Sequence, residues 1–283
     1  MNCLLVVNTL SGNSSKVHEE KLIERYAAED LVTVRYIRGA EDGYSLEGVD
    51  KLILCGGDGT LNHALSLCKD RDVDIYYFPV GTFNETAKDA RRRAKEDLSA
   101  IGRIGDADFA YVAAAGSFTD IGEASASSKR RFKLFAYFFR VLKSYRVHKI
   151  PAEIYCDAFS ASETYTLIML SNATRCFGFR FNRMHKPDGK DLELITVKAP
   201  EKDSLWGRIK MFFPFFRLFF LGFKKPHLGK ILRIVPVKSA CIRLEEETPF
   251  CIDGERYLLK GCLTAEKTKC TARLHIISPS ELS

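Results

Sequence analysis

Hydrophobic and polar residues alternate along the first 90 residues in blocks that are typical of βαβ units. Short apolar runs, which indicate strands buried in a parallel sheet, occupy residues 4–7, 31–37, 51–55 and 75–80. Helical spacing appears between the first two runs, near residues 16–28. The pattern therefore predicts an α/β domain in which helices cover a parallel sheet.

A second helix is predicted directly after the third of these strands. Leu61, Ala64, Leu65 and Cys68 recur at the i, i+3, i+4, i+7 spacing of a single helix face. Thr60 precedes that face, and threonine is a favoured N-cap residue. We therefore expect Thr60 to cap the helix.

The turn between this strand and this helix reads Gly56-Gly57-Asp58-Gly59-Thr60. Glycines let backbone N–H groups approach a phosphate, and a helix N-terminus adds partial positive charge. The Asp58 carboxylate would repel a bare phosphate, so its presence suits a Mg²⁺ ion between the two, or a proton taken from an attacking hydroxyl. The alternative is a tight turn with a solvated aspartate.

Two further polar loops follow strands of the same predicted sheet. They comprise Asn8 to Gly12 and Gly81 to Ala87. Open α/β sheets bind ligands at the carboxyl ends of their strands, so three such loops favour a binding site over ordinary turns.

The pattern changes beyond about residue 150, where short β-rich runs are separated by turn residues. Asp188-Gly189 and Asp253-Gly254 are dipeptides that favour hairpin turns. This half is therefore expected to be an antiparallel sandwich or barrel. Residues 113–128, which are rich in Gly, Ala and Ser, mark a reasonable boundary.

Length and composition agree with two folded domains, since the chain has 283 residues, of which 46% are hydrophobic. The N-terminal apolar run is short and has no basic region ahead of it, so we expect a cytoplasmic protein. The nine cysteines form no C-x-x-C pair and the histidines no H-E-x-x-H motif. Buried free thiols are therefore favoured over disulfides or a zinc site.

The net charge of +7 conceals two stretches without acids. Residues 124–152 carry eight Lys or Arg, and residues 204–244 carry nine. Lys129, Lys133, Arg140 and Lys143 would share one side of a helix, which is either a solvated face or a face toward anionic headgroups.

Seven of the twenty phenylalanines lie between residues 212 and 223. This segment is interrupted by Pro214 and Arg217 and is too short to span a bilayer. It is either an interfacial membrane contact or a core helix. No nucleic-acid-binding module is recognisable, so nucleic acid is not an expected partner.

Four motifs in order carry a resemblance to a known family. They are N-x-x-S-G, G-G-D-G-T, P-x-G-T-x-N-[DE]-x-A and D-G-E, and they begin at Asn8, Gly56, Pro79 and Asp253. The set resembles the diacylglycerol kinase catalytic-domain family, in particular its bacterial lipid kinase branch, whereas G-G-D-G-T alone is shared with NAD kinases and phosphofructokinases.

The resemblance implies an α/β N-terminal domain with a phosphofructokinase- or NAD kinase-like parallel sheet, and an antiparallel β-sandwich C-terminal domain. We place the nucleotide-binding domain at residues 1–120 and the lipid-substrate domain at 121–271. Residues 272–283 are expected to pack back onto the first domain.

The resemblance also implies roles for individual residues. The implied nucleotide, phosphate and metal contacts are Asn8, Thr9, Ser11, Gly57, Asp58, Gly59, Thr60, Thr82, Asn84 and Glu85. Glu255 matches the family's general base, although in sphingosine kinases the aspartate equivalent to Asp58 is given that role. Asp188 matches the aspartate that holds a structural Mg²⁺ in bacterial members.

The implied activity is transfer of the γ-phosphate of ATP, with Mg²⁺, to a lipid hydroxyl such as that of diacylglycerol. Expected partners are the lipid and an anionic membrane surface at the inner face of the membrane, and a homodimer is allowed for. Thr9, Glu85, Ala100 and Pro187 depart from the family's usual residues. The alternatives are a kinase of a soluble acceptor such as NAD, and a nucleotide-binding, membrane-associated regulator without catalysis.

Overall fold

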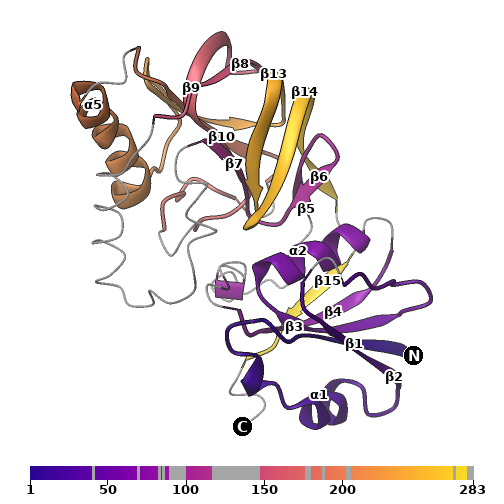
Figure 1. Cartoon of the computed structure of the whole chain (residues 1–283). Coiled ribbons are helices and arrows are strands. Elements are labelled where there is room, and N and C mark those ends of the chain that lie inside the picture. Colours follow the sequence, from indigo (N-terminus) through magenta and orange to yellow (C-terminus); the bar gives the residue numbers. More distant parts are fainter. Residues whose placement is uncertain are drawn as a thin grey trace. The chain divides into compact units, whose positions relative to one another are not determined.

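The computed structural model in Figure 1 divides the chain into two compact units. One unit contains Met1–Ile101 and Thr268–Ser283, and the other contains Gly102–Lys267. The residues that the structure describes are 1–39, 42–68, 71–81, 84, 87–88, 100–116, 147–175, 180–186, 189–201, 205–269 and 272–278.

The first unit is built on a parallel sheet, as the hydrophobic runs predict. Its strands are β1 (Asn2–Asn8), β2 (Leu31–Ile37), β3 (Lys51–Gly56), β4 (Asp74–Pro79) and β15 (Arg273–Ile276), in the order β15-β4-β3-β1-β2. All pairings among them are parallel. The central strands are buried because apolar side chains cover both faces, as with Leu4 and Leu5 on β1.

Helices connect these strands and supply part of the core. They are η1 (Ser14–Lys16), α1 (Glu19–Tyr26) and α2 (Asp58–Leu67). The prediction that Thr60 is the N-cap of α2 is wrong by one turn, since the extended cap residue is Gly57 and its carbonyl accepts the first helical bond from Leu61 N–H. Thr60 instead lies inside the first turn and is 8% exposed.

The second unit is built on an antiparallel sheet, as predicted. Its strands are β5 (Ala100–Ile104), β6 (Ala107–Phe109), β7 (Val112–Gly116), β8 (Ile150–Cys156), β9 (Phe159–Ser171), β10 (Leu192–Lys198), β11 (His227–Leu228), β12 (Leu232–Val237), β13 (Ser239–Ile252) and β14 (Glu255–Lys269). They pair in the order β11-β12-β10-β9-β7-β13-β14-β5-β6, with β8 also lying between β9 and β13. Whether this sheet folds into a sandwich stays a prediction.

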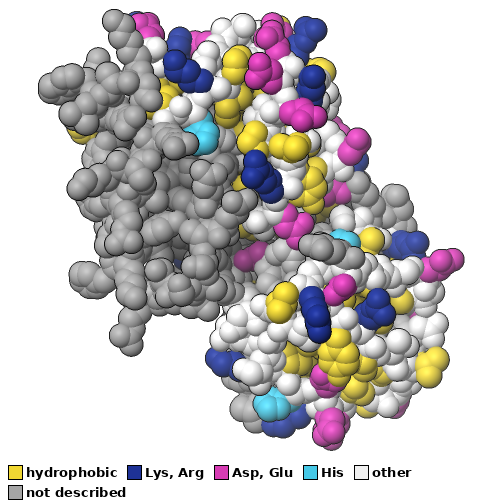
Figure 2. Space-filling model, viewed as in Figure 1, with side chains coloured by type: hydrophobic (Ala, Val, Ile, Leu, Met, Phe, Trp, Pro, Cys, Tyr) yellow, Lys and Arg dark blue, Asp and Glu magenta, His cyan; other side chains and the backbone are white. Residues whose placement is uncertain are grey.

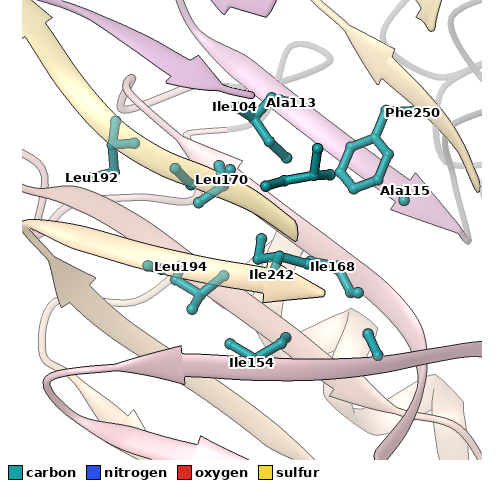
Figure 3. Close-up of a cluster of buried hydrophobic side chains, with 14 of the residues drawn as sticks. Ile104, Ala113, Ala115, Ile154, Ile168, Leu170, Leu192, Leu194, Ile242 and Phe250 are labelled. Carbon is teal, nitrogen blue, oxygen red and sulfur yellow. The ribbon is translucent and has the colours of Figure 1, made fainter. Parts of the chain in front are cut away.

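Strand β10 shows how this sheet buries both of its faces. Leu192 and Leu194 join a cluster that includes Ile242 and Phe250 from β13, which Figure 3 shows. The alternate residue Ile195 joins a second cluster. Two-sided burial explains why apolar residues of LELITV occupy both faces of the strand, and why Glu193 and Thr196 are buried with them.

The second cluster is covered by helix α5 (Leu205–Phe216) and the π-helical turn η3 (Arg217–Leu221). Phe215 and Leu218 are fully buried in it. Within the described residues, no helix is both long and apolar enough to cross a membrane.

The predicted domain boundary at residues 120/121 differs from the observed division at 101/102. Strand β7 pairs with β9 and β13, so residues 112–116 belong to the antiparallel sheet. At the other end, β15 is the edge strand beside β4 of the parallel sheet. Composition rich in Gly and Ala indicated a boundary here. Composition alone does not distinguish a linker from a strand of small residues such as β7.

Candidate functional site

The three predicted loops meet at one edge of the parallel sheet. Strands β1, β3 and β4 are neighbours, so their carboxyl ends lie at the same edge. The Asn8 Nδ2 atom donates a hydrogen bond to the Thr60 Oγ1 atom at 2.9 Å. Gly81 N–H donates to the Gly56 carbonyl at 3.1 Å. These bonds join the loop after β1 and the loop after β4 to the glycine turn between them.

Close backbone packing explains why this edge is so rich in glycine. A Cβ atom on Gly81 would lie 2.5 Å from the Gly57 Cα atom and 2.6 Å from the Asn84 Oδ1 atom. A Cβ atom on Gly56 would lie 2.4 Å from that of Thr60. The glycines therefore serve first to bring the ends of β3 and β4 together.

The loop after β1 is held by its own polar groups. The Asn8 Oδ1 atom accepts from Leu10 N–H at 3.1 Å, and the Asn8 carbonyl accepts from Ser11 N–H at 3.2 Å. The Thr9 N–H and Oγ1 groups both donate to the Ile37 carbonyl, at 2.9 and 3.2 Å. Both ends of the Asn8 amide are thus occupied in fixing the loop.

Asn84 offers an oxygen that is not used within the described structure. Its φ angle of 48° is in the left-handed region, which asparagine tolerates better than most residues. Its Nδ2 atom donates to the Gly81 carbonyl at 2.9 Å and to the Pro79 carbonyl at 3.2 Å. Its Oδ1 atom is buried and has no hydrogen-bond partner among the described residues. A buried orphan acceptor is a reason to look for a ligand.

Asp58 is the first helical residue of α2, so its carboxylate lies at the positive end of the helix. Behind it, the fully buried Tyr77 hydroxyl donates to the Gly56 carbonyl at 3.3 Å. Burial, and then the negative charge of Asp58, raise the pKa of Tyr77 well above its usual range. Tyr77 therefore stays a neutral donor that supports the turn.

Oxygen ligands fit this edge for a magnesium–nucleotide complex. Asp58 and Asn84 supply a carboxylate and an amide oxygen, the kinds of ligand that Mg²⁺ takes beside phosphate oxygens and water. Among the residues that the structure describes, no three His, Cys, Asp or Glu side chains could hold a metal ion on their own.

The second unit holds the D-G-E motif at the tip of a hairpin. Asp253 and Gly254 form a two-residue turn between β13 and β14 with φ angles of 49° and 100°. Positive φ at both positions is typical of a type I′ turn. The turn confirms the hairpin that the Asp-Gly dipeptide predicts.

Asp253 also anchors this turn to the connection between β6 and β7 and to the first residue of β7. Its buried carboxylate accepts N–H groups of Ala110, Tyr111 and Val112 at 2.5, 3.1 and 2.8 Å. Glu255, two residues on, is half-buried. The anchored turn therefore fixes the backbone that carries the predicted base.

Tyr257 lies on the same face of β14 as Glu255. Its hydroxyl donates to the Glu255 Oε2 atom at 3.5 Å, near the upper limit for a hydrogen bond. Burial first, and then the Glu255 charge, raise the pKa of the Tyr257 phenol.

A buried polar network, which the motif analysis missed, lies beside the predicted metal loop. The His185 Nδ1 atom lies 3.0 Å from Glu193 Oε2, and Asn182 Nδ2 donates to the same oxygen at 2.8 Å. The Asn182 Oδ1 atom accepts from His185 N–H at 3.0 Å. The sequence feature that could have indicated this network is the presence of three polar residues around the Asp188-Gly189 dipeptide. The network fixes both ends of the segment that contains Asp188.

The structure brings together part of the predicted site. The residues placed at the sheet edge are Asn8, Thr9, Ser11, Gly57, Asp58, Gly59, Thr60 and Asn84. Glu255 belongs to the second unit. Thr82, Glu85 and Asp188 lie outside the described residues, as does the predicted basic helix at 129–146. Asn13, which the motifs do not include, also reaches this edge, where its N–H donates to the Val80 carbonyl at 2.8 Å.

Some phenylalanines of residues 212–223 are buried, as expected for a core helix, and others are exposed, as expected for an interfacial contact. Phe215, Phe219 and Phe223 are at most 6% exposed and belong to the core, whereas Phe213 and Leu221 are 67% and 61% exposed. On the face that Figure 2 shows, the described acidic and basic side chains are interspersed rather than gathered by sign.

Comparison with known proteins finds a family match in the N-terminal segment. Residues 2–112 match the model of the diacylglycerol kinase catalytic domain, which confirms the resemblance for this segment. The segment contains all three loops of the sheet edge, while Glu255 lies beyond it. No curated protein sequence matches the chain.

Solved structures share the fold over almost the whole chain. A diacylglycerol kinase from Bacillus anthracis str. Sterne is 18% identical with a TM-score of 0.65, and covers 97% of each chain. Two structures from the same organism, provisionally described as diacylglycerol kinases, have TM-scores of 0.69. One is 19% identical and covers 97% of each chain. The other is 18% identical and covers 100% of this chain and 98% of its own. At this identity the likeness shows the fold alone.

Proposed function

We propose that this protein is an ATP- and Mg²⁺-dependent lipid kinase that phosphorylates a lipid hydroxyl, that of diacylglycerol in the first instance. The observation that supports the proposal is the sheet edge where Gly57 and Gly81 pack closely. Asp58, at the N-terminus of α2, and the Asn84 Oδ1 atom, which has no partner among the described residues, lie at this edge. The edge belongs to the segment that matches the diacylglycerol kinase catalytic-domain model. The backbone N–H groups of Gly59 and Thr60 lie in the first turn of α2, ahead of the first helical hydrogen bond, where a helix N-terminus favours phosphate.

The residues divide the work between binding and proton transfer. Asn8 and Thr60 brace the phosphate-binding turn, with Thr9 and Ser11 on the neighbouring loop toward the nucleotide. Asp58 and Asn84, with Thr82 and Glu85 from the loop that carries Asn84, would hold Mg²⁺, and the ion would offset charge on the transferring phosphoryl group. Glu255 accepts the proton of the lipid hydroxyl, and Asp58 is the alternative base. Asp188 would hold a second, structural Mg²⁺ ion.

A membrane contact would follow from the exposed face of α5 and η3. Phe213, Arg217 and Leu221 recur every four residues and are all exposed, and Lys224 and Lys225 follow them. Apolar side chains flanked by cations suit an anionic lipid surface. We propose peripheral association of a cytoplasmic protein with the inner face of the membrane through this face.

The activity is tested with purified protein, labelled ATP, Mg²⁺ and vesicles that contain diacylglycerol, sphingosine or other hydroxylated lipids. Phosphorylated lipid that requires both Mg²⁺ and vesicles supports the proposal. Phosphorylation of NAD without vesicles would instead identify a soluble-acceptor kinase. ATP binding without transfer to anything would identify a regulator.

The base is tested by Glu255→Gln, which keeps the size of the side chain. We expect lipid phosphorylation to fall by at least about a hundredfold while ATP binding is unchanged. Glu246→Gln, an exposed glutamate on the same hairpin, is the matched control and should retain activity. Full activity of Glu255→Gln would transfer the role to Asp58.

The membrane contact is tested with the double variant Phe213→Ser, Leu221→Ser. We expect weaker sedimentation with phosphatidylglycerol vesicles and an unchanged Tm, because both side chains are already exposed. Leu258→Ser changes a side chain of β14 that is 60% exposed and should not alter vesicle binding. Equal binding by all three proteins would refute the contact.

A further inference from the structure

Two cysteines meet on the outer face of the β13–β14 hairpin. The Sγ atoms of Cys241 and Cys262 lie 2.7 Å apart. Their neighbours Ala240 and Leu263 point into the core, so alternation along each strand directs both thiols outward. Cys262 is exposed and Cys241 partly exposed. The prediction that the cysteines are buried holds for Cys3, Cys55 and Cys68 but is wrong for this pair.

The surroundings of the two thiols give them different roles. Cys262 lies opposite Arg243 on the partner strand and is exposed, whereas Cys241 lies opposite Thr264 and is only partly exposed. The contact with Cys262 raises the pKa of the Cys241 thiol above its usual value. Cys262 is thus the more accessible nucleophile, and Cys241 is placed to react second.

We propose that Cys241 and Cys262 are a redox modification site that forms a reversible cross-strand disulfide by exchange with a low-molecular-weight disulfide. The Cys262 thiolate attacks one sulfur of the small disulfide, forming a mixed disulfide and releasing one thiolate. Cys241 then loses its proton to water and attacks the Cys262 Sγ atom, releasing the second. Two protein thiols are oxidised and one small disulfide is reduced to two thiols.

The bond requires little movement and would clamp an irregular part of the hairpin. The sulfurs would approach by about 0.7 Å to reach a bond length of about 2.0 Å. The closed loop would contain the bulge between Leu244 and Thr248 and the left-handed Gly261, as well as the turn at Asp253. Because a cross-link restricts the unfolded chain, we expect it to raise the Tm by on the order of 5 °C.

The experiment treats the full-length protein with oxidised glutathione and counts free thiols after denaturation. We expect the count to fall from nine to seven and peptide mapping to find Cys241 joined to Cys262. Dithiothreitol should restore nine thiols and the original Tm. Cys241→Ser should instead keep glutathione on Cys262, because the thiol that would resolve the mixed disulfide is absent.

Cys156→Ser is the matched control, since the Cys156 thiol packs against the inner cluster on the neighbouring strand β8. It should form the cross-link as readily as the wild type. An unreactive wild-type chain, a mixed disulfide that is never resolved, or a cross-link between other cysteines would each overturn the proposal. The wild-type mapping decides this even if a serine variant fails to fold.

Discussion

Gly81 packs against Gly57 so closely that an added methyl group has no room. We expect Gly81→Ala to lower the free energy of unfolding by about 1–3 kcal/mol, because the new Cβ atom would meet backbone, which cannot rotate away. It should also weaken ATP binding by displacing the Asn84 amide. Urea denaturation and nucleotide titration measure the two effects. Gly43→Ala, where a Cβ atom meets nothing within 4 Å, should change neither.

The buried Asp253 carboxylate accepts hydrogen bonds from three consecutive backbone N–H groups, those of residues 110–112. Asp253→Asn keeps the size and tolerates the positive φ angle, but replaces one acceptor oxygen with a donor. We expect a loss of about 2–3 kcal/mol in the free energy of unfolding. Asp157→Asn, in the exposed β8–β9 turn, should be neutral. An equal loss in both variants would show that the buried hydrogen bonds contribute little.

Residue types indicated which side chains carry candidate ligand atoms, but not how the loops that carry them pack together. The motif identified Asp58 and Asn84, because oxygen ligands and glycines have recognisable types. It could not show that Gly57 and Gly81 need each other, that Gly57 rather than Thr60 caps α2, or that Asn13 bonds to β4. Such contacts join residues far apart in the sequence.

An ion pair joins β15 to β4. The Arg273 Nε atom donates to Asp74 Oδ1 at 2.5 Å, and this bond lowers the pKa of Asp74 below its usual 3.8. A lowered carboxyl pKa gives stability that is present above pH 3.8 and lost as the pH falls through the folded-state value. We therefore expect hydrogen-exchange protection of β15 to decrease below about pH 4.

The measurement compares protection factors of the β15 amides between pH 5 and pH 2.5. Asp74→Asn should show lower protection at pH 5 and little further change on acidification. Asp72→Asn is the matched control, because Asp72 is 70% exposed and lies 3.5 Å from the same arginine. Identical acid profiles for Asp74→Asn and the wild type would mean that other groups hold β15 in place.

Strands were the most predictable elements, because β-branched and aromatic residues gather in them even where, as in β2, most side chains are exposed. Residues 31–37 form β2 with the predicted limits. The partner of a strand was harder to predict: residues 272–283 were expected to pack back onto the first domain, as they do, but the sequence did not show that β4 is the strand with which β15 pairs. Helix α5 illustrates the same limit, because composition could not separate buried Phe215 from exposed Phe213.

For the whole molecule, the chain leaves the parallel sheet after β4, builds the antiparallel unit and returns to the parallel sheet with its last strand. The fold class was predictable because period and strand length differ between the halves. The boundaries were not, since β5 to β7 are too short and too rich in small residues to indicate which sheet they join.

This return predicts that the C-terminus stabilises the N-terminal unit. Leu274 and Ile277 are at most 2% exposed, and β15 covers the edge of β4. A chain that ends at residue 271 would lose this burial and leave backbone groups of β4 unpaired. We expect protection to fall throughout β4, β3 and β1 and to persist in β9, β10 and β13, because the latter strands share clusters that contain no residue beyond 265. A chain that ends at residue 278 controls for truncation itself. Equal loss of protection in both sheets of the shorter chain would contradict the division into two units, each with its own core.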